Sequence, residues 1–160
     1  MLEADNLFSQ ASDRPEWWGA VCSAVAGISG IALVAVGAWQ ISAARDERRG
    51  WETLKACERY DTDPILDLCS RNLKTAKASG DLHIDAEKYS IDAISLLNYL
   101  EGIAAGVEDG LYVESIAKKH MQTIVKGLIE RYISSEVATK MKIFPDEYSL
   151  LLELHRRWQR

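Results

Sequence analysis

The longest hydrophobic stretch of the chain lies near its N-terminus. The 23 residues from Trp17 to Trp39 include no charged side chain. At about 1.5 Å per residue, a helix of this length spans roughly 34 Å, enough to cross a hydrocarbon core of about 30 Å. Trp17, Trp18 and Trp39 stand at the two ends, where indole rings favour the headgroup level. The pattern predicts a transmembrane helix over residues 17–40, after a short extracytoplasmic segment, residues 1–16.

Two other structures are compatible with such a stretch: a core helix of a soluble protein and a cleaved signal peptide. Core helices seldom run this long without a charge, and signal peptides have a shorter apolar region after a basic segment. Here the preceding residues are mostly acidic, and the basic ones follow the stretch: Arg45, Arg48, Arg49 and Lys55. Basic flanks stay in the cytoplasm. We therefore expect a single-pass protein of the inner (cytoplasmic) membrane, with the N-terminus outside and the C-terminal domain inside.

Small residues recur along the predicted transmembrane helix. Gly19, Ser23 and Gly27 are spaced by four and share one helix face, and Gly30 follows Ala26 at the same spacing. Small residues allow membrane helices to approach closely. The spacing predicts a helix that packs against copies of itself, which makes the protein a homo-oligomer. The alternative is that small residues are simply common in weakly hydrophobic anchors.

The rest of the chain shows the periodicity of helices, not of strands. No helix breaker precedes Gly50, so the apolar helix is expected to continue through a charged linker, residues 41–62. Asp63 and Pro64 are typical of an N-cap and a first helical position. Apolar positions then predict helices over about 65–78, 91–107 and 113–134, and a last one from Pro145. We expect an all-α protein whose residues 63–160 form a small helical cytosolic domain.

Apolar faces can be assigned on two of these helices. The first places five residues on one face: Ile65, Leu66, Cys69, Leu73 and Ala76. The second has the series Ile91, Ile94, Leu97, Leu100, Ile103, Ala104 and Val107. Within it, Glu101 is either a buried functional carboxylate or an acid at the edge of the buried face that pairs with a base. Gly102 and Gly106 are interpreted as close-packing sites and Gly110 as the C-cap.

Composition and motifs exclude several classes of function. The formal net charge of −5 argues against duplex nucleic acid as a partner. The three cysteines fit no metal spacing and predict no disulfide framework, and the three histidines are far apart in the sequence. No catalytic constellation is present. We expect neither an enzyme nor a metal site nor a cofactor.

Positive charge is the remaining candidate for binding chemistry. One predicted helix carries Arg71, Lys74 and Lys77 at every third position. Another carries a polar, basic stripe of Lys118, Lys119, Gln122 and Lys126, with His120 nearby. Such stripes suit phosphates because each lysine offers a mobile charge and several donors. The alternative is a pair of solvated helix faces. Repetition around the axis of an oligomer would turn either stripe into a ring of positive charge.

The segment from Leu96 to Tyr112, LLNYLEGIAAGVEDGLY, resembles a family of small bacterial proteins with an N-terminal anchor and a helical cytosolic domain. The whole layout is similar to a membrane-associated ancillary effector of type III CRISPR systems. That resemblance implies a tetramer that binds the second messenger cyclic tetra-adenylate and then perturbs the membrane as antiviral defence.

Two functions follow as expectations. The first is a membrane effector that senses a cyclic oligoadenylate, in which ligand binding to the cytosolic oligomer opens a pore or disrupts the bilayer. The second is a membrane-tethered helical adaptor that docks a protein partner without ligand gating. A basic symmetric cavity in the oligomer would favour the first function, and an exposed apolar groove would favour the second.

Overall fold

The computed structural model describes residues 15–160, with the backbone alone for residues 15–22 and His83. Residues 1–14 of the predicted N-terminal segment therefore lie outside the described residues. The same holds for the side chains of Trp17 and Trp18 and for the surroundings of Gly19. Every regular element of the described part is a helix, and no strand is found there, so the all-α prediction is confirmed.

One long helix, α2 (Pro15–Thr62), contains both the apolar stretch and the charged linker. The prediction that the apolar helix continues past residue 45 is therefore confirmed. The chain divides into two compact units, Met1–Asp46 and Glu47–Arg160. The first unit contains the apolar part of α2 and the start of the predicted linker, residues 41–46. The second contains residues 47–62, called the linker part of α2 below, together with all later helices.

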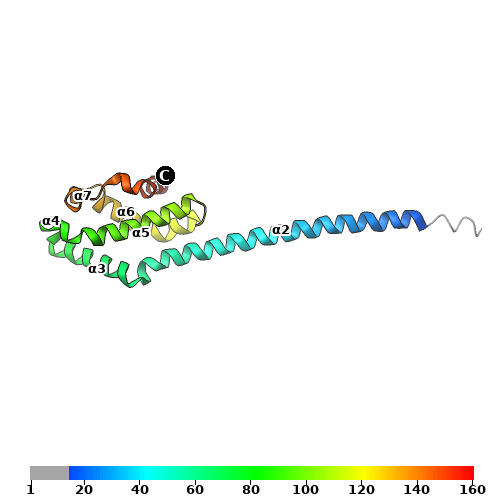
Figure 1. Ribbon diagram of the computed structural model, residues 1–160, viewed down its shortest axis with the longest axis horizontal. Helices are drawn as coiled ribbons and strands as arrows, with labels where there is room; N and C mark the ends of the chain where they lie inside the picture. Colours follow the sequence, from blue (N-terminus) through cyan, green and yellow to red (C-terminus); the bar gives the residue numbers. More distant parts are fainter. Residues whose placement is uncertain (1–14) are drawn as a thin grey trace, which may run out of the picture. The chain divides into compact units, whose positions relative to one another are not determined.

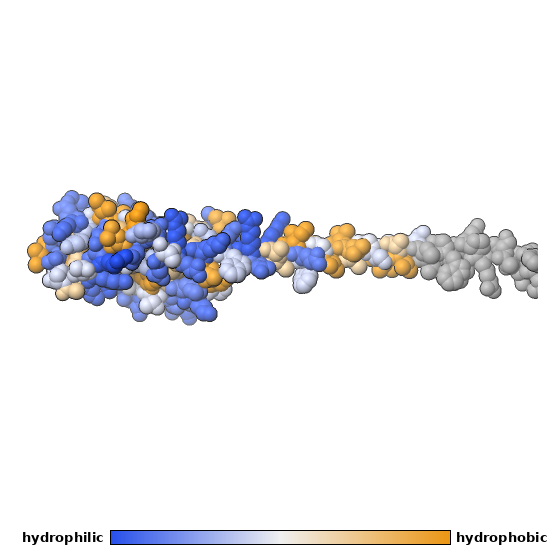
Figure 2. Space-filling model, turned by 90° about the horizontal axis from the view of Figure 1, so that it is seen from below, coloured by the Kyte–Doolittle hydropathy of each residue, from blue (hydrophilic) through white to orange (hydrophobic). Residues whose placement is uncertain are grey.

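The apolar part of α2 exposes its hydrophobic side chains. Ile31, Leu33 and Val34 are each more than 70% exposed, and no residue of the most apolar window is buried. Figure 2 shows hydrophobic residues on the surface of this segment. Among the described residues this is the one helix long and apolar enough to cross a membrane, judged by length and composition.

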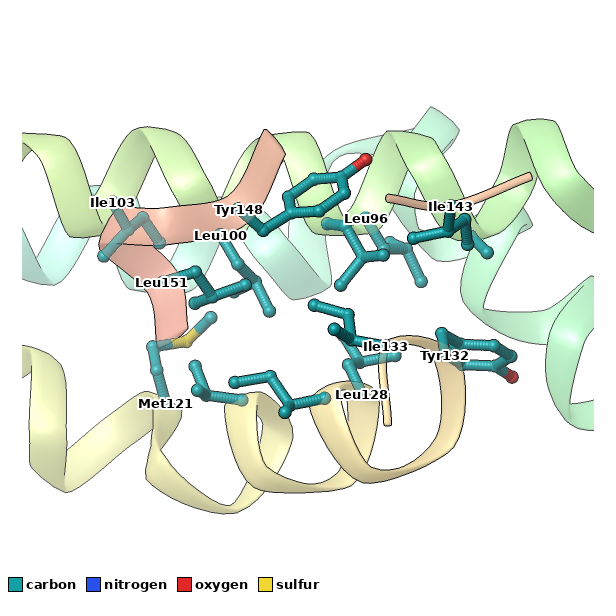
Figure 3. Packing of buried hydrophobic residues seen from close by; sticks show 14 of the residues in the cluster. Leu96, Leu100, Ile103, Met121, Leu128, Tyr132, Ile133, Ile143, Tyr148 and Leu151 are labelled. Carbon is teal, nitrogen blue, oxygen red and sulfur yellow. The ribbon is translucent and has the colours of Figure 1, made fainter. Parts of the chain in front are cut away.

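The second unit is a bundle built around α5. Its elements after α2 are α3 (Pro64–Ser79), α4 (Asp81–Ile84), the 3-10 helix η1 (Ala86–Tyr89), α5 (Ser90–Glu108), α6 (Glu114–Tyr132), α7 (Glu136–Met141), η2 (Pro145–Tyr148) and α8 (Ser149–Trp158). Helix α5 packs against α3, α6 and α8 (Figure 1). The unit thereby forms one core, which Figure 3 shows from close by.

The boundaries of α3 follow from local chemistry. The Asp63 carboxylate accepts hydrogen bonds from Ile65 N at 2.9 Å and Leu66 N at 3.4 Å, and Pro64 occupies the first helical position. These backbone donors lower the pKa of the Asp63 carboxyl in the folded protein. The cap therefore stabilises the fold at pH values above the ordinary carboxyl pKa. This stabilisation is lost as the pH falls through the lowered pKa of the folded state. At the other end Gly80 adopts φ 82°, a left-handed conformation that favours glycine. The predicted start and end of this helix are both confirmed.

Most, but not all, of the predicted apolar positions are in the core. Leu66, Leu73 and Leu100 are buried, whereas Ile65 is 68% exposed and Ile91 is 76% exposed. Ile65 and Ile91 lie in the first turn of α3 and of α5, at positions that the packing between these helices leaves uncovered. The assignment of these two residues to the buried faces was wrong.

The two glycines of α5 have different surroundings. A β-carbon on Gly106 would overlap the ring of Tyr112, so this glycine is a close-packing site, as predicted. A β-carbon on Gly102 would meet no atom within 4 Å, so the same interpretation is wrong there. Gly110 has φ 68° and lies one residue beyond the cap Asp109, just after the end of α5.

Glu101 has a structural role that neither sequence interpretation described. Its two carboxylate oxygens accept hydrogen bonds from Leu150 N at 3.2 Å and Leu151 N at 2.8 Å. These amides belong to the first turn of α8, where backbone donors lack partners within the helix. Glu101 therefore caps α8 from α5, and among the described residues it forms no ion pair with a base. The negative charge at the N-terminus of α8 also suits the helix dipole.

Candidate functional site

The linker part of α2 forms one wall of a groove whose other wall is α6. This α2–α6 groove has a volume of about 550 Å³ and is lined by Glu47, Gly50, Trp51, Leu54, Ser115, Ile116, Lys119 and His120. On each helix the lining residues are spaced by one, three or four positions, which places them on one face. Two of the predicted ligand-binding residues, Lys119 and His120, lie here.

A polar contact fixes α2 against the start of α6. The Thr53 side chain is fully buried, and its hydroxyl donates to Arg49 O at 2.6 Å and accepts from Val113 N at 2.8 Å. Val113 is the N-cap residue of α6, and no side chain caps this helix locally. Thr53 therefore holds together the two helices that form the groove.

We expect Thr53→Val to destabilise the second unit by about 1–3 kcal/mol, because the half-buried Val113 amide would lose its acceptor. Thr53→Ser is the matched control, since it keeps the hydroxyl, and it should retain most of the stability. Thermal unfolding of the full chain in detergent, followed by circular dichroism, measures both. Equal unfolding temperatures for the two variants would contradict this role.

The α2–α6 groove combines stacking and hydrogen-bonding groups. The Trp51 indole is 59% exposed. Lys119 and His120 are exposed, and within the described part of the chain neither has a hydrogen-bond or ion-pair partner. An exposed indole can stack on a nucleobase, and a lysine beside it can pair with a phosphate. Glu47 is the acidic residue of the lining.

The other predicted ligand-binding residues do not join this groove. The Gln122 amide donates to Trp158 O at 2.9 Å, and Lys118 lies one turn before it on the same face of α6. Lys126 lies 3.9 Å from Glu130, and Arg71 pairs with Asp67 on its own helix. Lys74 lines a separate cleft between α3 and α6. The two basic stripes therefore do not form one binding site within a single chain.

A second groove, between α2 and α5, was not anticipated. This α2–α5 groove has a volume of about 560 Å³ and is lined by Glu52, Lys55, Ala56, Arg59, Asn98, Tyr99, Gly102, Ile103 and Tyr112. The Tyr99 hydroxyl donates to the Ala56 carbonyl, and burial raises the pKa of Tyr99 to about 12. Five lining residues come from the segment Leu96–Tyr112. The signal in the sequence was the spacing of Asn98 and Gly102, four positions apart on one face of a largely apolar helix, and both residues are exposed in the structure.

Comparison with known proteins places the chain in a family. A domain of unknown function, DUF4760, matches residues 27–134. The chain belongs to the DUF4760 family. No curated protein and no solved structure matches it. The DUF4760 match begins within the apolar part of α2 and ends just after α6, so it includes every residue that lines the two grooves on α2.

Proposed function

We propose that this DUF4760 protein is a membrane-anchored sensor of a cyclic oligoadenylate, cyclic tetra-adenylate, that acts in type III CRISPR antiviral defence. In this proposal the apolar part of α2 spans the cytoplasmic membrane, with the N-terminus outside. The helical domain lies in the cytoplasm and binds the ligand as a homo-oligomer, a tetramer. Binding then disturbs the membrane helices, by pore opening or by disruption of the bilayer.

The observation that carries the proposal is the composition of the α2–α6 groove. An exposed indole, Trp51, lies with Lys119 and His120 in one groove, and neither Lys119 nor His120 has a hydrogen-bond or ion-pair partner among the described residues. A cyclic oligoadenylate presents several adenines and several phosphates. Each subunit would offer one base-stacking group and one phosphate-binding group, so the ligand would bridge subunits.

The groove also supplies a connection to the membrane. Gly50, Trp51 and Leu54 belong to α2, the helix that contains the apolar segment. A ligand shifts an equilibrium only if it binds one state more tightly than the other. A ligand in the groove would contact α2 and α6 at the same time. Any movement of α2 relative to α6 would change these contacts, so the ligand would bind the two arrangements with different affinities.

Self-association of the apolar segment is the second requirement of the proposal. A shallow surface groove of about 500 Å³ runs along this segment and is lined by Ala26, Gly27, Gly30, Ile31, Val34, Ala35 and Ala38. Two of the predicted packing residues, Gly27 and Gly30, lie in it, and a β-carbon on either would meet no atom within 4 Å. Another helix can therefore approach the backbone closely at this point.

We expect Gly27→Leu combined with Gly30→Leu to weaken self-association about tenfold, because the bulky side chains would keep neighbouring backbones apart. Sedimentation equilibrium of the full chain in density-matched detergent measures the association. Ile28→Leu, outside the groove, is the control and should associate like the unmodified chain. Unchanged association of the double variant would contradict packing through this face.

Titration of cyclic tetra-adenylate into the full chain in detergent at low salt tests the proposal. We expect saturable binding and quenching of tryptophan fluorescence, with affinity falling as salt is added, because phosphate contacts are screened. Absence of binding at low salt would refute ligand sensing.

The adaptor remains the second candidate function, and one observation favours it. Ile65 and Leu68 lie one turn apart on α3 and are 68% and 57% exposed. Such residues are suited to docking a protein partner. A chain that binds no cyclic oligoadenylate but loses a cellular partner on Leu68→Asp would be an adaptor.

A further inference from the structure

A third cavity of the domain lies away from both grooves on α2. This α3–α6 cleft has a volume of about 310 Å³, with walls from α3, α6, the end of α2 and α5. Leu73, Leu96 and Ile124 make part of the wall apolar, and Gly127 leaves α6 open at the cleft. None of its lining residues lines the α2–α6 groove.

One buried hydroxyl in the cleft has no acceptor for its proton. Tyr132 is fully buried, and its hydroxyl donates to no residue within the described part of the chain, while the Arg131 guanidinium beside it can only donate. In Figure 3 the Tyr132 ring points away from Leu96 and Tyr148, with the hydroxyl at its outer end. A buried donor without an acceptor costs about 1–3 kcal/mol, so native structures seldom leave one. An acceptor from outside the chain is therefore expected at this hydroxyl.

The charges around the cleft favour an anionic acceptor. Lys74 and Arg131 line it, against one acid, Asp61. The Arg131 guanidinium carbon lies 5.8 Å from the centre of the Tyr132 ring. Burial raises the pKa of Tyr132, with Arg131 opposing the shift, so the hydroxyl is protonated and able to donate at neutral pH. Hydrogen bonds from neutral and cationic donors to an anion are stronger than those to water.

A smaller cavity extends the same arrangement. It has a volume of about 170 Å³ and shares Arg131 and Tyr132 with the cleft, while Lys77 adds a third cation. Lys74 and Lys77 are one turn apart on α3, so they belong to the stripe noted in the sequence. Lys74 and Lys77 are therefore not simply part of a solvated helix face. Each lines a cavity that the Tyr132 side chain also lines.

We propose that the α3–α6 cleft binds a small oxyanion with an apolar body, a phosphate monoester or a carboxylate, through the Tyr132 hydroxyl, Arg131 and Lys74. The apolar wall around Leu73 and Ile124 covers the body of the ligand. This site is separate from the proposed cyclic-oligoadenylate groove and does not depend on it.

Calorimetric titration of the full chain in detergent, in a buffer without phosphate, tests the site. The probes are phenyl phosphate and benzoate as two sources of the oxyanion, and benzyl alcohol as the neutral analogue. We expect at least one anionic probe to bind saturably with a Kd of about 1 mM or tighter, and benzyl alcohol to bind at least about tenfold more weakly. Binding of benzyl alcohol as tight as that of the anions would overturn the proposal, and so would the absence of saturation, which would mean that water alone fills the cleft.

Two variants locate the binding. Tyr132→Phe removes the hydroxyl but keeps the ring, and Lys74→Ala changes an exposed position, so the second remains informative if the first fails to fold. Each should weaken the anionic probe about threefold to tenfold. Lys126→Ala removes the same charge at an exposed position that lines neither the cleft nor the grooves on α2, and it should leave this affinity unchanged. Unchanged affinity of both cleft variants would place the probe elsewhere and overturn the proposal, with no consequence for cyclic tetra-adenylate binding.

Discussion

Glu101→Ala is expected to destabilise the helical domain by about 3 kcal/mol, because hydrogen bonds to a charged acceptor contribute about 1.5–3 kcal/mol each. The variant removes the acceptor for Leu150 N and Leu151 N at the start of α8. Helix α8 contributes Leu151, Leu154 and Trp158 to the core, so loss of its cap also loosens that packing. Thermal unfolding of the full chain in detergent measures the change.

Two controls separate the cap from a simple loss of charge. Glu101→Gln keeps one carbonyl acceptor and should cost less than half as much as alanine. Glu130→Ala removes an exposed glutamate whose contact with Lys126 spans 3.9 Å, and should change stability by no more than about 0.5 kcal/mol. If Glu101→Ala and Glu130→Ala unfold at the same temperature, the Glu101 carboxylate does not stabilise α8 as a cap.

Lys119→Glu is expected to weaken cyclic tetra-adenylate binding by about 100-fold or more. The substitution replaces a cation that donates hydrogen bonds to a phosphate with a carboxylate that repels it. In an oligomeric site the same change occurs in every subunit. A hundredfold change corresponds to about 2.7 kcal/mol, which one reversed charge contact can supply in a partly desolvated groove. Fluorescence titration of the full chain in detergent measures the affinity.

The matched control for Lys119→Glu lies on the same helix. Lys126→Glu makes the same charge change at a residue that does not line the α2–α6 groove, and it should weaken binding only a few-fold. Trp51→Ala, at the opposite wall, should weaken binding about tenfold or more through loss of stacking. If Lys126→Glu weakened binding of cyclic tetra-adenylate as much as Lys119→Glu does, the overall charge of the protein and not the α2–α6 groove would account for the affinity.

The elements with long periodic patterns could be predicted from the sequence. Helices α2, α3, α5 and α6 follow from uninterrupted helical periodicity, and Asp63 with Pro64 marks a start that local chemistry alone determines. Helices α4 and α7 and the 3-10 helix η1 have four to six residues each, too few for a period to be recognised. Helix α4 packs against α3 and η1, η1 also packs against α5, and α7 packs against η1 and α6. No local signal in the sequence encodes these contacts.

The candidate site could be predicted only in part. Lys119 and His120 were predicted from a polar, basic helix face. Their neighbour Trp51 belongs to α2, whose last residue, Thr62, lies 52 positions before Glu114, the first residue of α6. Which faces of α2 and α6 meet is decided by tertiary contacts such as that of Thr53 with Val113. Glu101 shows the same limit, because the partners of its carboxylate are about 50 residues away in sequence.

The extent of the DUF4760 match separates two parts of the domain. The match ends at residue 134, before α7, η2 and α8. The C-terminal helices are nevertheless part of the core, since Tyr148, Leu151 and Leu154 are buried against α5 and α6. The grooves on α2 thus belong to the part of the chain that defines the family, whereas the Glu101 cap connects that part to the C-terminal helices.

The most direct test of the account is dye release from lipid vesicles that contain the full chain, on addition of cyclic tetra-adenylate. We expect release that depends on ligand concentration, that is lost in Lys119→Glu and that persists in Lys126→Glu. Vesicles that keep their dye at ligand concentrations that saturate the purified protein would contradict the coupling of the groove to the bilayer.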